Sequence, residues 1–138
     1  MPKSEETAVA KLVADELNVR FAGKKRLDGW GEVDCYSELS PSRYLILEVE
    51  SGQHHPNTNV LKLWPYLDAH PDLSITLAHA FIQGSRCCNS SRGNLATWLG
   101  VKLESFFPDR FDYCRLIISP PPHCFVEGLE KLRESVVH

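Results

Sequence analysis

The 138-residue sequence lacks the features that would assign it to a membrane or secreted class. No apolar run approaches the roughly 20 residues that a membrane-spanning helix needs. The first residues, MPKSEETAVAKL, contain no apolar segment typical of a secretory signal peptide, so the sequence predicts a cytoplasmic protein. The formal net charge is only −3, which means that any contact with nucleic acid has to be made by a local patch.

Cysteine pairs with the spacing of a zinc site are also missing. The chain has 5 cysteines at scattered positions and no Cys-x-x-Cys pair, so the sequence does not support a structural zinc site. An odd number of widely spaced thiols is typical of a reducing compartment. The adjacent Cys87 and Cys88 could form a redox pair or bind a soft metal, but two small residues in a loop are the simpler interpretation.

What remains is an ordinary globular composition, with 43% hydrophobic and 24% charged residues. A chain of this length can bury a sizeable core without disulfides. We therefore expect a single domain that covers residues 1–138.

Hydrophobic periodicity predicts an α/β fold. The expected helices cover residues 7–19, 59–67, 93–107 and 127–137, and the expected strands cover residues 20–26, 30–36, 43–50, 74–82 and 111–119. Short turn-prone segments separate the first three strands, which favours antiparallel hairpins. Because the later strands follow helices, crossover connections should make that part of the sheet parallel. The prediction is a mixed central sheet flanked by helices.

The helix expected at residues 93–107 carries an apolar stripe that includes Leu95, Trp98 and Phe106. Stripes of this kind usually face the core, and a dimer face is the second interpretation. Trp30 and Trp64 are likewise expected in the core or at an interface.

Acidic side chains are expected to gather on one face of the sheet. Glu48 and Glu50 alternate with apolar residues, so they point to the same side of their strand, and Asp34 belongs to the strand before it. Clustered carboxylates repel each other and are costly to desolvate, and a hard divalent cation is the usual reason to keep them. Glu16, on or beside the apolar face of the first helix, could join the cluster. The alternative is that Glu48 and Glu50 line the solvated face of an edge strand.

These residues resemble a known motif. Gly29-Trp-Gly-Glu-Val-Asp34 and Tyr44-Leu-Ile-Leu-Glu48-Val-Glu50 are similar to the core of the PD-(D/E)xK nuclease superfamily, with Val33 in the place of the proline. The resemblance extends over residues 7–82 and implies the restriction-endonuclease-like fold. It implies an αβββαβ core, to which this chain would add a C-terminal helix, strand and helix.

The resemblance also implies roles for individual residues. Asp34 and Glu48 would bind Mg²⁺ or Mn²⁺, and Glu50 would stand where the family usually has a lysine. Glu50 could then be a further metal or water contact. Some members carry the lysine on the following helix, where Lys62 is the candidate. Glu16 would match the glutamate that the family often has on its first helix.

Polar residues after the second acidic strand are candidate substrate contacts. Asn59 lies three positions before Lys62, so both belong to one helical face. Gln53 and His55 belong to a polar stretch that could contact substrate, and a histidine could also bind metal or carry a proton. A plain polar loop is the alternative. His79, within an apolar strand, is expected to be a hydrogen-bonded core histidine.

The sequence thus predicts a metal-dependent nuclease-like protein that hydrolyses phosphodiester bonds of nucleic acid, with DNA as the expected partner and no membrane partner. A homodimer or a partner protein is a further expectation. One alternative is a catalytically inactive nuclease-fold module that binds nucleic acid or protein, which the missing lysine and the net acidity support. Another is a purely protein-binding domain built through the tryptophan-bearing helices.

Overall fold

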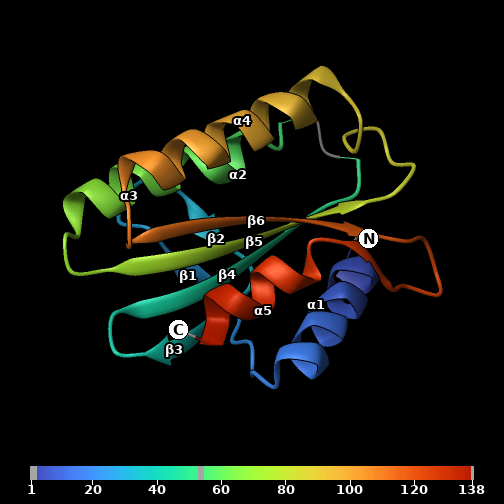
Figure 1. Cartoon of the computed structure of the whole chain (residues 1–138), viewed down its shortest axis with the longest axis horizontal. Coiled ribbons are helices and arrows are strands. Elements are labelled where there is room, and N and C mark those ends of the chain that lie inside the picture. The colour runs from blue at the N-terminus through green and yellow to red at the C-terminus, as the bar shows by residue number, and fades with distance from the viewer. Residues whose placement is uncertain (1–2, 53–54, 138) are drawn as a thin grey trace.

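The computed structural model, which describes residues 3–52 and 55–137, contains a five-stranded mixed sheet with helices on both faces (Figure 1). The strands lie in the order β3 (Tyr36–Ser40), β4 (Arg43–Glu50), β5 (Ser74–Ile82), β6 (Phe111–Ile118) and β7 (Phe125–Glu127). The central β4, β5 and β6 are parallel, and the two outer strands are antiparallel to their neighbours. The structure therefore confirms the expected mixed sheet flanked by helices.

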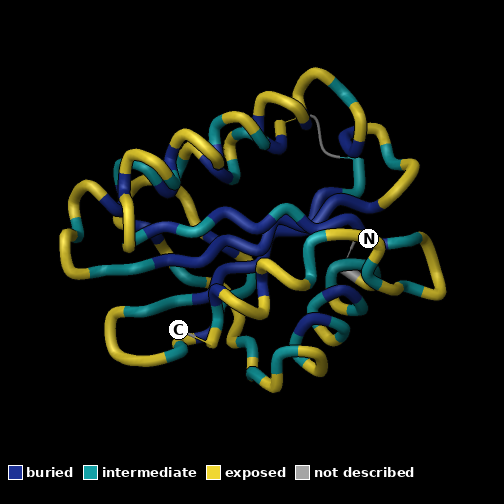
Figure 2. Tube along the Cα trace, in the orientation of Figure 1, coloured by how far each residue is buried: buried dark blue, intermediate teal, exposed yellow. Residues whose placement is uncertain are grey.

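The helices cover the two faces of the sheet in separate groups (Figure 1). The helices are α1 (Lys3–Leu17) and α5 (Leu129–Val137) on one face, and α2 (Thr58–Leu61), α3 (Leu63–Ala69) and α4 (Ser91–Phe106) on the other. Side chains of a strand alternate between faces, so Leu45 and Leu47 pack with Val13 of α1, whereas Ile46 packs with Leu63 of α3. In Figure 2 the central strands are largely buried between the two helical layers.

The helix α4 is rotated relative to the sequence expectation. Its buried residues are Gly93, Ala96, Gly100 and Leu103, and the first three are small. Small residues let the helix backbone approach the sheet closely: a Cβ atom at Gly100 would lie 2.4 Å from the ring of Tyr113. The larger apolar residues consequently face outward, and Leu95, Trp98 and Phe106 are more than half exposed. The expectation that this stripe belongs to the core is wrong for these three residues.

The N-terminal strands are shorter than expected. The β1 (Lys25–Arg26) and β2 (Glu32–Val33) strands form a separate two-stranded antiparallel ribbon, and the strand that pairs with β4 is β3, most of which was not expected to be a strand. The turn between β1 and β2 contains three positive φ angles, 54° at Asp28, 95° at Gly29 and 101° at Gly31. Left-handed backbone of this kind interrupts a strand. Trp30, at the tip of the ribbon, is 52% exposed, so of the two expected places, core or interface, the core is excluded.

Two further elements differ from the sequence expectation. The helix expected at residues 59–67 is divided at Lys62 into α2 and α3. Pro65 then falls in the first turn of α3, where the missing N–H costs no helical hydrogen bond. The short β7 pairs with β6 and was not expected, and the last helix begins at Leu129 after it. Among residues 3–52 and 55–137, none of the helices has both the length and the apolar character needed to cross a bilayer.

Candidate functional site

The pairing of β3 with β4 ends just before the acidic residues of β4. Tyr36 lies opposite Ile46, and the N–H of Leu47 donates a hydrogen bond to the carbonyl of Cys35 at 3.0 Å. Asp34, two residues before Tyr36, lies in a bend outside the ladder, and it lines the same space beside β4 as Glu48. The chain then turns away toward β2, which opens the edge of β4 beside Glu48.

A cleft of about 350 Å³ occupies this opening. The residues that line it come from α1, β2, β4, α2 and the segment between β2 and β3: Glu6, Ala10, Glu32, Asp34, Cys35, Leu47, Glu48, Val49, Asn59 and Lys62. Asp34 is exposed, whereas the Glu48 side chain is only 7% exposed. The structure thus brings together Asp34, Glu48, Asn59 and Lys62, which the sequence singled out separately.

Lys62 is held at three points. Its Nζ atom lies 2.9 Å from Glu48 Oε2, and the side chain is 10% exposed. The same atom donates hydrogen bonds to Asn59 Oδ1 at 2.9 Å and to the carbonyl oxygen of Glu32 at 2.8 Å. The contact with Glu48 joins opposite charges. An ammonium group has three N–H donors, so these contacts fix its position.

Glu50 lies behind the cleft instead of lining it. Its Oε2 atom accepts hydrogen bonds from Asn59 Nδ2 at 2.6 Å and from His79 Nε2 at 2.7 Å. His79 Nδ1 lies 2.8 Å from the hydroxyl oxygen of Tyr113. Glu50 and His79 are both fully buried, and Glu50 Oε1 has no hydrogen-bond partner among the described residues. Glu50 is therefore placed to support Asn59, away from the space where substrate could enter.

The protonation of the cleft groups follows from their burial. Burial raises the pKa of Glu48 to about 7; the nearby Lys62 opposes this rise, and the charges of Glu50 and Asp34 add to it. Burial, followed by the charges of Glu48, Asp34 and Glu6, raises the pKa of the Cys35 thiol to about 12. Cys35 therefore keeps its proton at neutral pH, so the cleft offers oxygen ligands and no thiolate.

The raised pKa of Glu48 predicts a pH-dependent stability. Between pH 4.5, its ordinary pKa, and about pH 7, the folded state keeps a proton that the unfolded state has released. The free energy of unfolding should therefore fall as the pH rises through this range, by up to about 3 kcal/mol. Urea unfolding from pH 4 to 8 measures this, with Glu48→Gln expected to remove the Glu48 component. Identical pH profiles for the two proteins would contradict the prediction.

Several sequence candidates lie elsewhere. Glu16 pairs with Arg133 of α5, so its expected place in the carboxylate cluster is corrected, and Glu6 is the α1 carboxylate that lines the cleft. His55 is exposed, does not line the cleft, and its carbonyl oxygen accepts a hydrogen bond from the N–H of Thr58 at 3.1 Å. Gln53 lies outside the described residues.

The cleft offers carboxylates that suit a hard divalent ion. Within residues 3–52 and 55–137, no set of three or more His, Cys, Asp or Glu side chains is arranged to hold a metal ion. However, Mg²⁺ usually takes one or two protein carboxylates and keeps several waters. Asp34 and Glu48 supply two carboxylates to a cleft with room for water, and oxygen donors of this kind fit Mg²⁺ or Mn²⁺.

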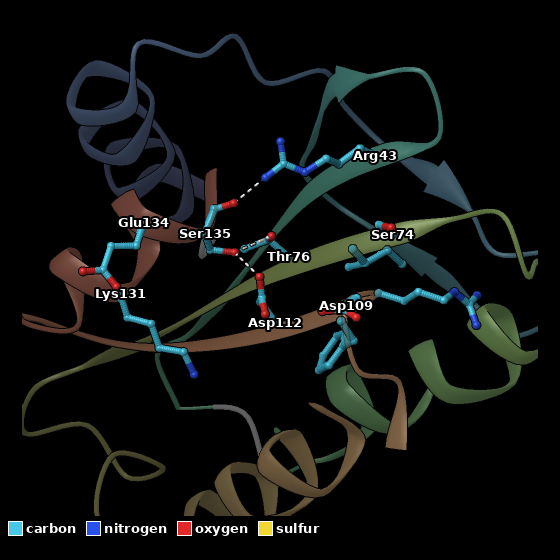
Figure 3. A pocket seen from close by; sticks show the side chains of 11 residues that line it. Arg43, Ser74, Thr76, Asp109, Asp112, Lys131, Glu134 and Ser135 are labelled. Carbon is cyan, nitrogen blue, oxygen red and sulfur yellow. Dashed lines mark hydrogen bonds between the residues drawn. The ribbon is translucent and has the colours of Figure 1, made fainter. Parts of the chain in front are cut away.

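A second, larger cavity of about 550 Å³ lies at the opposite end of the parallel strands (Figure 3). Its polar groups bind one another. Ser135 Oγ donates to Asp112 Oδ2 at 2.6 Å and lies 2.7 Å from Thr76 Oγ1, and Arg43 binds the carbonyl oxygen of Ser135. Arg110 binds three backbone carbonyl groups. The first contacts join α5 to the N-terminal ends of the strands, and those of Arg110 join the start of β6 to α3 and the segment before β5, which is a structural role.

The cleft at the edge of β4 is therefore the candidate site that this chain's own residues define. No family model, curated protein or solved structure with which the chain was compared matches it. The chemistry open to this site depends on the cleft's carboxylates, its lysine and their surroundings.

Proposed function

We propose that the chain is a metal-dependent nuclease-like protein that hydrolyses phosphodiester bonds of nucleic acid. The proposal assigns it a site of the PD-(D/E)xK type in which Lys62 takes the place of the lysine replaced by Glu50. The observation that carries the proposal is the 2.9 Å ion pair between Lys62 Nζ and Glu48 Oε2, in a cleft that Asp34 also lines. Two carboxylates and one lysine from adjacent elements are the groups that such a site needs.

Asp34 and Glu48 would hold the Mg²⁺ or Mn²⁺ ion. A bound ion of this kind activates water and stabilises the negative charge that develops at phosphorus. Lys62, held beside Glu48 at the wall of the cleft, would orient the attacking water and offset charge on the phosphate. Asn59 fixes the direction of the Lys62 ammonium group through its Oδ1 atom.

The ribbon of β1 and β2 would supply contacts to a nucleic-acid strand beside the cleft. Its tip presents Trp30, which is 52% exposed and whose indole ring could stack on an unpaired base. Lys24, which precedes β1, is 64% exposed and pairs with Glu32, and Arg26 lies in β1; both could contact phosphates. A local patch of this kind is what a chain with net charge −3 would need.

Cleavage of plasmid and single-stranded DNA during titration with Mg²⁺ or Mn²⁺ tests the proposal. We expect metal-dependent cleavage that the Asp34→Asn variant loses by roughly a hundredfold or more, because several kcal/mol of transition-state stabilisation would be lost. The matched control is Asp15→Asn, which changes an exposed carboxylate of α1 that pairs only with Lys11 among the contacts described. Cleavage without metal, or equal cleavage by Asp34→Asn, would contradict the proposal.

The second candidate function is a binding module without turnover. Two observations favour it: Lys62 already uses its donors inside the protein, and Leu95, Trp98 and Phe106 form an exposed apolar stripe on α4. DNA binding that weakens with salt but leaves the strands intact would indicate a nucleic-acid module. A dimer seen by light scattering without DNA affinity would indicate a protein-binding domain.

A further inference from the structure

We infer that His79 and Tyr113 are positioning residues for this site. A buried chain of hydrogen bonds from Tyr113 through His79 and Glu50 holds Asn59, and Asn59 in turn fixes the ammonium group of Lys62 against Glu48. The inference rests on the proposed function only where it concerns catalysis. Whether these hydrogen bonds hold Lys62 in place can be measured without catalysis.

The chain of hydrogen bonds crosses three neighbouring strands beneath α2 and α4. Glu50 ends β4, His79 lies in β5 and Tyr113 lies in β6, and their side chains all point to the face covered by α2, α3 and α4. The links are 2.8 Å from Tyr113 to His79, 2.7 Å from His79 to Glu50 and 2.6 Å from Glu50 to Asn59. The final link, from Asn59 Oδ1 to Lys62 Nζ, is 2.9 Å. A continuous path thus joins the core to the wall of the cleft.

The chemistry of each group sets the direction of each hydrogen bond. Burial raises the pKa of Tyr113, so its hydroxyl keeps its proton and can donate it to His79 Nδ1 in the tautomer whose ring proton is on Nε2. His79 then carries its proton on Nε2 and donates to Glu50 Oε2. Asn59 has one suitable orientation, because turning its amide would place oxygen against Glu50 and an N–H donor against Lys62. Each link therefore fixes the next.

Core packing alone does not account for these groups. Glu50 and His79 are fully buried beside apolar residues such as Phe81, and Glu50 Oε1 lacks a hydrogen-bond partner among the described residues. Desolvating such groups is costly, and well-packed apolar side chains of similar volume often stabilise a core as well or better. A polar chain that ends at the lysine of the cleft has a use that apolar residues could not supply.

The acylation rate of Lys62 by acetic anhydride, followed by mass spectrometry, tests the inference. Lys11, which is 76% exposed on α1, provides the internal reference rate. Losing one buried hydrogen bond should raise the Lys62 rate roughly fivefold in His79→Leu and in Tyr113→Phe. His79→Gln should restore a rate near that of the unaltered protein, because the glutamine amide can still donate to Glu50. Tyr113→Phe, which deletes only one hydroxyl, serves if His79→Leu does not fold.

The control is Ser135→Ala, which deletes a buried hydroxyl at the opposite end of the strands. It should lower Tm about as much as Tyr113→Phe while leaving the Lys62 rate unchanged. An unchanged Lys62 rate in folded His79→Leu and Tyr113→Phe would overturn the inference, as would an equal rise in Ser135→Ala.

Turnover gives a second readout that a general loss of stability would not reproduce. If the protein cleaves DNA, Tyr113→Phe should lower kcat roughly fivefold while the midpoint of the Mg²⁺ titration stays unchanged. A shifted midpoint with unchanged kcat would overturn the positioning role. If no cleavage occurs, the proposed function fails, and the acylation rates still decide whether His79 and Tyr113 position Lys62.

Discussion

The Lys62→Met variant is expected to lose roughly a hundredfold or more of the proposed nuclease turnover and, at pH 8, about 2–4 kcal/mol of its free energy of unfolding. Methionine keeps the apolar stem but removes the ammonium group that faces Glu48 at 2.9 Å. The carboxylate of Glu48, 7% exposed, would then be buried with its main compensating charge gone. Because Lys62 lowers the pKa of Glu48, its removal raises that pKa above about 7.

The loss of stability should therefore depend on pH. At pH 5.5 Glu48 is protonated in the folded variant and carries no charge, so most of the cost disappears. Urea unfolding at pH 5.5 and pH 8 measures the difference. The double variant Lys62→Met, Glu48→Gln should regain stability at pH 8 without regaining turnover, which separates the two effects.

A matched control exists on α1. Lys11→Met removes an exposed lysine that pairs with Asp15, and such pairs contribute little, so the change should stay within about 0.5 kcal/mol. An equal loss of stability in Lys62→Met at both pH values, or a comparable loss in Lys11→Met, would contradict the buried ion pair as the cause.

The Gly128→Ala variant is expected to lose about 3–5 kcal/mol of its free energy of unfolding, from backbone strain and steric overlap together. Gly128 joins β7 to α5 with a φ of +94°, which residues with a Cβ rarely adopt. A Cβ atom there would also lie 2.1 Å from the carbonyl oxygen of Arg115. That oxygen belongs to the backbone of β6, where Arg115 is held in place by its pairing with His79 of β5.

Two other glycines separate these causes. Gly29 has a φ of +95° with no atom within 4 Å of an added Cβ, so Gly29→Ala should cost about 1–2 kcal/mol from strain alone. Gly23 has open space and no strained φ, so Gly23→Ala should change stability by less than about 1 kcal/mol. Urea unfolding of the three variants should rank them in this order, and a Gly128→Ala cost no larger than that of Gly29→Ala would exclude the steric contact.

The strands that carry the site could be predicted from the sequence. The expected strands at residues 43–50 and 74–82 have the same bounds as β4 and β5, because continuous apolar runs leave little freedom in the interior of a sheet. Period-two alternation then placed Glu48 and Glu50 on one face. The short connections between the first strands predicted hairpins, which placed Asp34 near Glu48. The residues that pair directly with β4 nevertheless belong to β3.

The choice between Glu6 and Glu16 could not be made from helical periodicity. Both lie three positions from a buried valine, Val9 for Glu6 and Val13 for Glu16, so both lie near the buried face of α1. Which one reaches the cleft depends on the end of α1 that lies beside β4, a tertiary fact that no local pattern contains. At the C-terminal end of α1, Glu16 forms an ion pair with Arg133.

The orientation of α4 escaped prediction for a different reason. Hydrophobicity ranks Leu95 and Trp98 above Gly93 and Gly100, yet Gly100 packs against Tyr113 of the sheet and Gly93 against the backbone of Cys87. Close approach of a helix backbone is driven by the absence of side-chain volume, which a hydrophobicity pattern does not score. The spacing of Gly93, Ala96 and Gly100 was the available signal, since it places small residues on one helical face.

The alternation along β4 also limits how the length of the chain can change. Glu48 and Glu50 face the layer of α2 and α3, whereas Leu47 and Val49 face α1. Deleting one residue early in β4 would exchange the two sets and turn both acids toward α1, away from Asn59 and Lys62. Single substitutions would alter this site by degrees, but a register shift of one residue within the strand would remove it.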